Sequence, residues 1–450
     1  MRFYNRENEV GRLKDIREKS LGGSKMTIVL GRRRIGKTRL VFETFGERNF
    51  LYFFVARKAD NLLAREFAEE ISRRLEIPIY GEIHSSKQIF EILFEYSKQT
   101  PLTVVVDEFQ NYQYVNSSLF SDLQNLWDRN KDRGKCNLIL MGSVPTLMSR
   151  IFMNQKEPLF GRADYQVSLP PFDLKTTAEV LRDHGVNSPE ALVDYMIFTG
   201  GVPKYLEQVV DYGKENFFDF IDAFIHTDSL ILNEGKLSLV EEFGKNYSVY
   251  FAILQLLASG KTRRSDLMGS LQDIKELGGY LKNLTESLGI VQKKQPVGTT
   301  ASGKNTRYCL SDFFYSFWFR FINKYQSAIE AENLQYVRDR IRQDWSVYKG
   351  WKFEDLVRDY LKKLALFNII GSYWDRKGEN ELDVVAVNEM EKIILIGECK
   401  LNGQRINLNQ VREKSVSLLE KYPNFKPIYK SFYPGMIHQL LENPEDYLLK

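Results

Sequence analysis

Residues 26–38, MTIVLGRRRIGKT, constrain the fold of this chain more than any other stretch. The apolar residues 27–30 lead into residues 31–38, which fit the phosphate-loop pattern G-x-x-x-x-G-K-[ST], and residues 39–45 suit a helix. In this context, consecutive backbone N–H groups curl around a polyphosphate, and the N-terminus of the following helix adds positive charge. A chance glycine-rich turn is the alternative, but the flanking strand and helix patterns argue against it.

Each position of the phosphate loop has an expected role in binding ATP and Mg²⁺. Lys37 should reach the β- and γ-phosphates, and Thr38 should place its hydroxyl on the Mg²⁺. The two loop glycines should supply backbone conformations that a Cβ would forbid. The expected nucleotide-binding residues are Gly31, Arg32, Arg33, Arg34, Ile35, Gly36, Lys37 and Thr38.

A second apolar run, residues 102–110 (LTVVVDEFQ), contains two adjacent carboxylates near its end. A strand that delivers Asp107 at its carboxyl end would bring an acid to the Mg²⁺ shell, and Glu108 would orient or deprotonate the attacking water. A third run, residues 137–143, ends on Ser143, which either touches the γ-phosphate or attacking water or simply forms a turn. Strands that alternate with helices predict a parallel α/β sheet covered on both faces.

Length and composition limit the number of domains, the expected partners and the cellular compartment. The length of 450 residues favours about three domains. The 63 Lys and Arg residues nearly balance 59 Asp and Glu residues, so net charge does not by itself indicate a nucleic-acid or membrane partner. The three cysteines have neither CxxC nor metal-ligand spacing, which suits a reducing cytoplasm. The apolar runs are far shorter than the roughly 20 residues that span a bilayer. Together these features predict a soluble cytoplasmic protein with no membrane partner.

Residues 158–165, PLFGRADY, offer Arg162 directly after a glycine. An arginine near the γ-phosphate stabilises transition-state charge, either in cis or from a neighbouring subunit of a homo-oligomer. A solvated surface arginine is the plainer interpretation.

The order of these motifs resembles the archaeal-type ATPases at the border of the AAA+ and STAND groups, a family also common in bacteria. That family pairs the ATPase module with a C-terminal nuclease-like domain. The motifs are RExE at residues 6–9, the phosphate loop, VVVDEFQ at 104–110, ILMGS at 139–143, PLFGR at 158–162, LPPF at 169–172 and TGGVPKYLE at 199–207.

The resemblance implies ATP binding and hydrolysis, with a helical lid that closes over the nucleotide. Residues 201–205 would lie near the nucleotide, and Lys204 is the charged member of that stretch. The further roles that the resemblance implies are metal and water binding by Asp107 and Glu108, sensing by Ser143 and an arginine function for Arg162.

Residues 247–312 read as three helices and a β-hairpin, the plan of a winged helix-turn-helix. The hairpin would have strands near residues 289–291 and 307–310 and a loop at 297–304. Such modules bind DNA but also dock proteins, so both partners stay open. Nine basic residues outnumber four acidic ones here and suit phosphate contacts: Lys261, Arg263, Arg264, Lys275, Lys282, Lys293, Lys294, Lys304 and Arg307.

The C-terminal part reads as a helix at residues 345–366, which holds Glu354, followed by three strands. Side chains alternate along a strand, so Glu398 and Lys400 share one side while Cys399 faces the other. A neighbouring strand can bring Asp383 opposite them.

Two such carboxylates would hold Mg²⁺ against a scissile phosphate, and Lys400 would position or activate the water. Asp followed by Glu-x-Lys on paired strands resembles the PD-(D/E)xK nuclease fold, with Glu354 at the position of that fold's first-helix carboxylate. The expected metal ligands here are Glu354, Asp383 and Glu398. Gln410 is a candidate for the rim of the site, with a plain surface glutamine as the alternative.

The sequence therefore predicts an α/β protein in four parts. These are a P-loop ATPase core with a parallel sheet (1–170), a helical lid (171–235), a winged helix-turn-helix (236–325) and a restriction-endonuclease-like α/β domain (326–450). The first interpretation is an ATP hydrolase that binds DNA and cleaves it with Mg²⁺. The second is an ATP-dependent regulatory switch that binds DNA or a protein without cutting. A metabolic kinase fits less well, because the last two parts leave little room for an acceptor pocket.

Overall fold

The computed structural model describes residues 1–450 except 47–49, 245–246, 272–273, 275, 300–304 and 376–379. Lys275 and Lys304 of the basic set, and residues 300–304 of the expected hairpin loop, lie outside the described residues. The chain forms two compact units, Arg2–Pro171 and Phe172–Lys450, the latter together with Met1.

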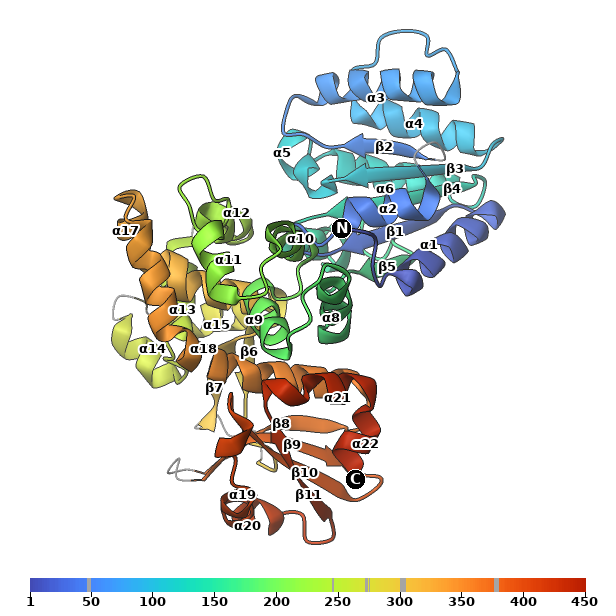
Figure 1. The fold of residues 1–450 in the computed structure, drawn as a ribbon. Helices are drawn as coiled ribbons and strands as arrows, with labels where there is room; N and C mark the ends of the chain where they lie inside the picture. Colours follow the sequence, from blue (N-terminus) through green and yellow to red (C-terminus); the bar gives the residue numbers. More distant parts are fainter. Residues whose placement is uncertain (47–49, 245–246, 272–273, 275, 300–304, 376–379) are drawn as a thin grey trace. The chain divides into compact units, whose positions relative to one another are not determined.

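The first unit is built on a parallel sheet of five strands in the order β2-β3-β4-β1-β5 (Figure 1). Its strands are β1 (Lys25–Leu30), β2 (Leu51–Phe54), β3 (Leu102–Asp107), β4 (Cys136–Gly142) and β5 (Tyr165–Ser168). The two central runs that the sequence indicates, β3 and β4, are buried at every position, as expected for strands covered on both faces.

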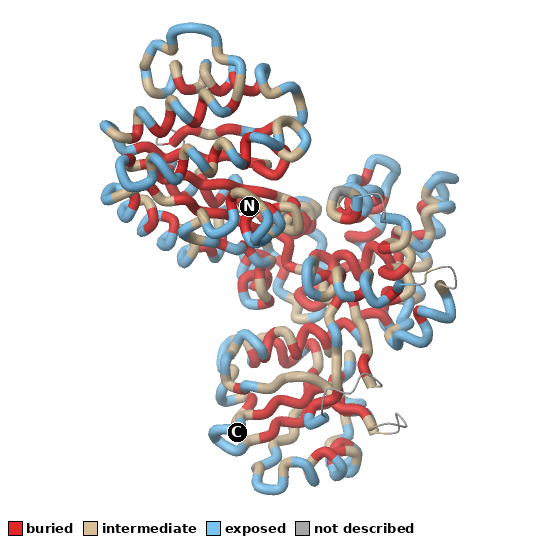
Figure 2. The backbone as a smooth tube through the Cα atoms, turned by 180° about the vertical axis from the view of Figure 1, so that it is seen from behind, coloured by how far each residue is buried: buried red, intermediate tan, exposed pale blue. Residues whose placement is uncertain are grey.

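Helices cover both faces of this sheet because successive side chains point to opposite sides. Ile28 packs with residues of α3, α4 and α6, whereas the next residue, Val29, packs with α1 and α2. The helices of this unit are α1 (Glu7–Lys19), α2 (Lys37–Phe45), α3 (Asp60–Leu75), α4 (Ser86–Ser97), α5 (Tyr112–Val115), α6 (Leu119–Asn130) and α7 (Pro145–Met153). Figure 2 shows the strands buried between these layers.

The second unit begins with a helical region and a short hairpin. The helices are α8 (Leu174–Asp183), α9 (Pro189–Thr199), α10 (Pro203–Tyr212), α11 (Phe217–Phe224), α12 (Ile231–Phe243), α13 (Tyr247–Ala258), α14 (Arg264–Ser270) and α15 (Leu277–Lys282). A π-helical turn, Asn283–Ser287, continues α15, and β6 (Val291–Lys294) then pairs antiparallel with β7 (Arg307–Leu310).

An aromatic core joins these helices to the segment that follows the hairpin. That segment comprises α16 (Phe313–Phe317), a π-helical turn (Trp318–Ile322) and α17 (Gln326–Glu330). Phe317 lies 4.8 Å from Phe198 of α9 between ring centroids, and the Trp318 indole donates to the Ile231 carbonyl of α12 at 2.8 Å.

The unit ends in a mixed sheet in the order β11-β10-β9-β8, preceded by the 30-residue helix α18 (Leu334–Lys363). β8 (Ile369–Trp374), β9 (Glu381–Asn388) and β10 (Ile393–Cys399) run antiparallel, and β11 (Lys426–Phe432) is parallel to β10. The remaining helices are α19 (Leu408–Lys414), α20 (Val416–Leu419), α21 (Ile437–Glu442) and α22 (Pro444–Leu449).

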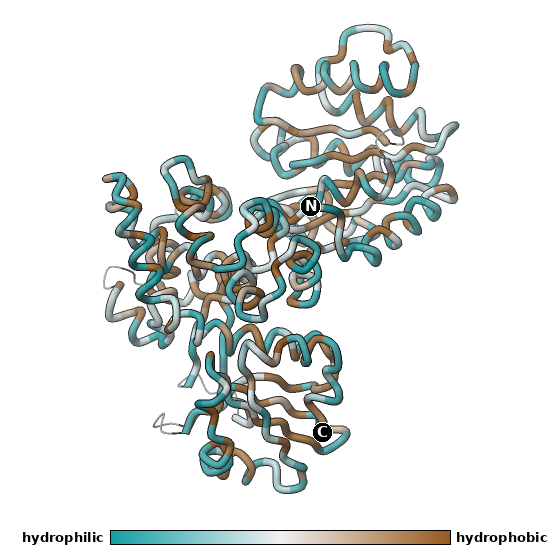
Figure 3. Tube along the Cα trace, viewed as in Figure 1, coloured by the Kyte–Doolittle hydropathy of each residue, from teal (hydrophilic) through white to brown (hydrophobic). Residues whose placement is uncertain are grey.

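Hydropathy follows this layering: the strands of both sheets are largely apolar, and the sides of the helices that face away from the sheets are more polar (Figure 3). No helix within the described residues is both long and apolar enough to cross a membrane.

Candidate functional site

The phosphate loop connects the end of β1 to α2, and its two glycines are needed for different reasons. A Cβ on Gly31 would lie 2.8 Å from Ile35 Cγ2 and 3.2 Å from the Leu169 carbonyl, so space is what excludes a side chain there. Gly36 has φ of 91°, a left-handed conformation that glycine adopts without strain. The turn therefore closes tightly and begins α2 at Lys37.

Lys37 folds back over this loop. Its ammonium donates to the Gly31 carbonyl at 2.7 Å and to the Arg32 carbonyl at 3.2 Å, and the residue is only 7% exposed. Burial lowers the pKa of Lys37, while the nearby Asp107 and Glu108 carboxylates act in the opposite direction. The Lys37 amine is therefore buried against the loop carbonyls, with Asp107 and Glu108 nearby.

Asp107, at the end of β3, is the hub of the hydrogen bonds around the loop. One carboxylate oxygen accepts from the Thr38 hydroxyl at 2.9 Å and from the Tyr52 hydroxyl at 2.7 Å. The other accepts from the Glu108 N–H at 2.9 Å. Tyr52 was not predicted from the sequence; the available signal was one tyrosine among phenylalanines in β2, the strand that pairs with β3.

Glu108 follows Asp107 in a strained backbone conformation, with φ of 53°. Its carboxylate accepts from the Ser143 hydroxyl at 2.7 Å and from the Gln110 amide at 2.5 Å. Ser143 follows β4, so the structure brings the ends of β3 and β4 together at this carboxylate. Gln110 was also missed, although it belongs to the DEFQ run.

Arg162 lies in a different set of contacts. Its guanidinium donates to the Asp128 carboxylate at 3.1 Å and to the Phe160 carbonyl at 2.9 Å, and its side chain is about one-third exposed. These are the contacts of a surface ion pair.

Residues 201–205 belong to the second unit, where Lys204 pairs with Glu207 at 2.7 Å and Tyr205 stacks on Phe314 at 4.0 Å.

In the second unit, β9 and β10 bring Asp383 and Glu398 to the same end of the mixed sheet. Val384 pairs with Gly397, so the next pair in this antiparallel register is Asp383 with Glu398. Asp383 accepts from the Cys399 N–H at 2.8 Å, and the Lys400 ammonium lies 2.7 Å from a Glu398 oxygen. Burial opposes the charge on Lys400, but the hydrogen bond to Glu398 and the nearby Glu398, Asp383 and Glu354 charges together raise the pKa of Lys400.

Glu354, on α18, approaches the same region. Burial raises its pKa, and the nearby Asp383 carboxylate adds to that effect. Burial likewise raises the pKa of Asp383, with a further contribution from Glu398. Arg358, one turn along α18, lies 3.5 Å from the Glu354 carboxylate and donates to the Asp383 carbonyl.

These acids do not form a complete ligand cluster by themselves. Over the part of the chain that the structure describes, no group of three or more His, Cys, Asp or Glu side chains is arranged to hold a metal ion. Gln410 lies exposed in the first turn of α19, where its N–H donates to Asn407 at 3.4 Å.

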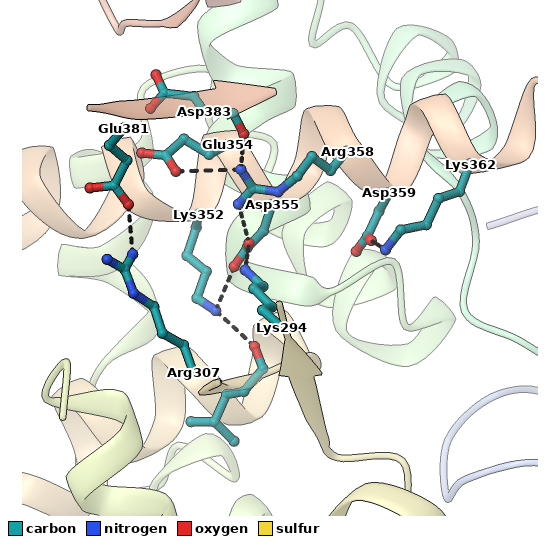
Figure 4. Close-up of polar contacts among 11 residues, drawn as sticks. Lys294, Arg307, Lys352, Glu354, Asp355, Arg358, Asp359, Lys362, Glu381 and Asp383 are labelled. Carbon is teal, nitrogen blue, oxygen red and sulfur yellow. Dashed lines mark hydrogen bonds and ion pairs between the residues drawn. The ribbon is translucent and has the colours of Figure 1, made fainter. Parts of the chain in front are cut away.

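Two basic residues of the hairpin are bound to the C-terminal part (Figure 4). Lys294 of β6 forms an ion pair with Asp355, and Arg307 of β7 lies 2.6 Å from Glu381. Both cations are paired with carboxylates in this structure, and their contact with DNA phosphates stays a prediction. Arg263, Arg264 and Lys293 are exposed.

Comparison with known proteins agrees with this geometry. Residues 3–209 match the family model described as "ATPase domain predominantly from Archaea". Residues 3–209 are thus similar to an archaeal-type ATPase domain. Residues 318–414, beyond this ATPase domain, match a second family, described as archaeal and bacterial proteins of unknown function.

Three individual proteins are also similar to this chain. The uncharacterized protein MJECL04 of Methanocaldococcus jannaschii is 29% identical over 412 residues, which cover 88% of this chain and 87% of that protein. The Walker-type ATPase PABY2304 of Pyrococcus abyssi superposes with a TM-score of 0.54 at 20% identity, covering 71% of this chain and 96% of that one. The ORC2 protein of Aeropyrum pernix, in complexes with ADPNP and ADP, gives 0.49 at 17% identity, covering 74% and 95%.

Proposed function

We propose that this protein binds and hydrolyses ATP with Mg²⁺, and that its second unit binds DNA and cleaves it in a Mg²⁺-dependent reaction. The observation that carries the ATPase part is the 2.9 Å contact between the Thr38 hydroxyl and the Asp107 carboxylate, next to the buried Lys37. A hydroxyl at the start of a helix and a carboxylate at a strand end are the oxygen donors that a nucleotide-bound Mg²⁺ requires.

The donor set fits Mg²⁺, with Thr38 and Asp107 as the residues that would hold it. When bound, the ion neutralises charge on the β- and γ-phosphates. The rest is done by side chains of the ATPase domain: Lys37 places an ammonium at the phosphates, and Glu108 orients the attacking water and accepts its proton. Ser143 and Gln110 hold the Glu108 carboxylate in one orientation.

DNA cleavage is supported by the arrangement of acids on α18, β9 and β10. Glu354 on the helix, Asp383 and Glu398 on paired strands, and Lys400 beside Glu398 are the features on which the resemblance to PD-(D/E)xK nucleases rests. Asp383 and Glu398 would hold the metal, with Glu354 near them. Lys400 would orient the water that attacks the scissile phosphate, because its ion pair with Glu398 holds the ammonium in place.

DNA contact would use the exposed basic residues Arg263, Arg264 and Lys293, while Lys294 and Arg307 keep the hairpin on the C-terminal part. Arg162 would act on ATP either in cis or, in a homo-oligomer, on a partner's nucleotide, and in both cases it would leave its contact with Asp128.

A second function, an ATP-dependent switch that binds DNA or a protein without cutting, is favoured by one observation. The carboxylates of the second unit do not form a three-membered ligand group among the described residues. A cleavage panel separates the two functions: duplex, branched and single-stranded DNA with Mg²⁺, with and without ATP. Cleavage that Glu398→Gln abolishes supports the nuclease, and ATP-dependent binding without cleavage of any substrate supports the switch.

A further inference from the structure

A pocket of about 460 Å³ lies between the hairpin and the C-terminal part of the second unit. Its walls come from the turn between α13 and α14, from β6 and β7, from α18, and from β8 and β9. The Lys294–Asp355 and Arg307–Glu381 ion pairs join opposite walls (Figure 4). The volume falls in the range of small-molecule sites, so the pocket admits one nucleotide but no duplex.

The acids of the candidate nuclease site form part of this pocket. Both Glu354 and Asp383 line it, and Arg358 ties them together through the Glu354 carboxylate and the Asp383 carbonyl. A strand whose phosphate lies at these acids would therefore place an adjoining nucleotide in the pocket.

Trp351 supplies an aromatic surface next to these acids. It lies three residues before Glu354 on α18, and residues at this spacing share one face of a helix. The residue is 48% exposed although it lines the pocket, and a Cβ on Gly260 would lie 3.7 Å from its ring. The Arg320 guanidinium lies 5.7 Å from the ring centroid. A large exposed indole in a pocket suits stacking with a base.

The charges of the pocket favour a neutral base over a second phosphate. Four basic side chains line it, and each is bound to a carboxylate: Lys294, Lys352 and Arg358 to Asp355, and Arg307 to Glu381. The lining also includes the hydroxyl-bearing residues Ser259, Thr262 and Ser372, which offer hydrogen bonds to a base edge.

We infer that this pocket takes the base of one unpaired nucleotide, stacked on Trp351, while the adjoining phosphate lies at Glu354 and Asp383. The substrate class is then DNA with a single-stranded end or flap rather than a blunt duplex. This inference rests on the proposed DNA cleavage by the same acids and names the DNA structure that they act on.

Binding of the full chain to dye-labelled DNA with Ca²⁺ in place of Mg²⁺ tests the inference, because a phosphate approaches the Glu354 and Asp383 carboxylates only when a divalent ion offsets their charge. The probes are a blunt duplex, the same duplex with a five-nucleotide overhang, and that overhang made abasic. Wild type should bind the overhang at least about fivefold more tightly than the blunt or abasic forms. Trp351→Ala should lose this preference, and Trp351→Phe should keep most of it.

Two further variants make the outcome decisive. Ser259→Trp keeps Trp351 but fills the pocket from its exposed rim, so it should also lose the overhang preference. Tyr336→Ala removes another exposed aromatic residue of α18 and should keep it. Equal binding of blunt and overhang DNA by wild type, or a preference that survives in both Trp351→Ala and Ser259→Trp, overturns the inference.

Cleavage by the same variants in Mg²⁺ separates this inference from the proposed function. If wild type cleaves DNA but shows no overhang preference, the pocket does not bind an unpaired base, and the proposed nuclease function stands. A Trp351-dependent overhang preference without cleavage refutes the nuclease and leaves the pocket as a binding site.

Discussion

The Thr38 hydroxyl donates a 2.9 Å hydrogen bond to the Asp107 carboxylate across 69 positions of the chain. The contact joins the first turn of α2 to the end of β3, and Tyr52 of β2 donates to the same oxygen at 2.7 Å. The position of this carboxylate therefore depends on three elements of the ATPase domain.

Tyr52→Phe tests that dependence. A hydrogen bond to a charged group contributes about 1.5–3 kcal/mol, so its loss should loosen Asp107 and raise the Mg²⁺ concentration for half-maximal ATP hydrolysis several-fold. A Mg²⁺ titration of phosphate release measures this. Tyr80→Phe, at a tyrosine of the same unit that is 88% exposed, should leave the titration unchanged. An unaltered Mg²⁺ requirement in Tyr52→Phe would show that Asp107 is oriented without Tyr52.

Glu108→Gln separates ATP binding from hydrolysis. General-base catalysis typically contributes about 10²- to 10⁴-fold, so turnover should fall by that factor while ATP binding persists. Phosphate release and equilibrium binding of ATP measure the two quantities. Glu91→Gln, at an exposed residue of α4, is the matched control and should behave as wild type. Turnover within twofold of wild type in Glu108→Gln would remove Glu108 from the mechanism.

Glu398→Gln and Lys400→Ala should abolish Mg²⁺-dependent DNA cleavage without altering the ATPase rate, because both residues lie in the second unit. Gel analysis of cleaved DNA and phosphate release, measured on the same preparations, give the two rates. Glu391→Gln, exposed in the turn before β10, should cleave normally. Cleavage that persists in both variants would place the reaction elsewhere.

Lys294→Met should destabilise the second unit, because Asp355 is buried and loses one of its three cationic partners. We expect a loss of about 1–3 kcal/mol in the free energy of unfolding. Denaturant unfolding followed by tryptophan fluorescence is suitable, since four of the five tryptophans lie in this unit.

Lys293→Met is the control for that measurement. Its side chain is exposed and points to the other face of β6, so the change should stay within about 0.5 kcal/mol. Equal stability of the two variants would mean that the hairpin is not fastened through Lys294.

The pattern of apolar residues along the sequence was enough to predict the strands of the first unit. The apolar runs before Gly31, at Asp107 and before Ser143 predicted the strands, and the parallel α/β sheet is confirmed. Because carboxyl ends of parallel strands meet at one edge, residues at those ends could be expected to converge. The roles assigned to them stay predictions.

Contacts between distant segments could not be predicted in the same way. Tyr52 reaches Asp107 only because β2 pairs with β3, and no periodicity in β2 signals that partner. Lys294 looked like a phosphate contact because its acidic partner, Asp355, lies 61 residues later. The last of the three helices expected within residues 247–312 ends as α15 at Lys282 and continues as the π-helical turn Asn283–Ser287, which the sequence pattern did not predict.

ATP hydrolysis at the phosphate loop is tested by the rate of phosphate release from ATP in Mg²⁺, measured for wild type and for Lys37→Ala. Lys37 acts on phosphate charge from within the loop, so wild type should turn over ATP and Lys37→Ala should not, with the circular dichroism spectrum unchanged. Arg39→Ala, which removes an exposed cation two residues further along α2, should turn over ATP as wild type does. Turnover that survives in a folded Lys37→Ala protein would contradict the account.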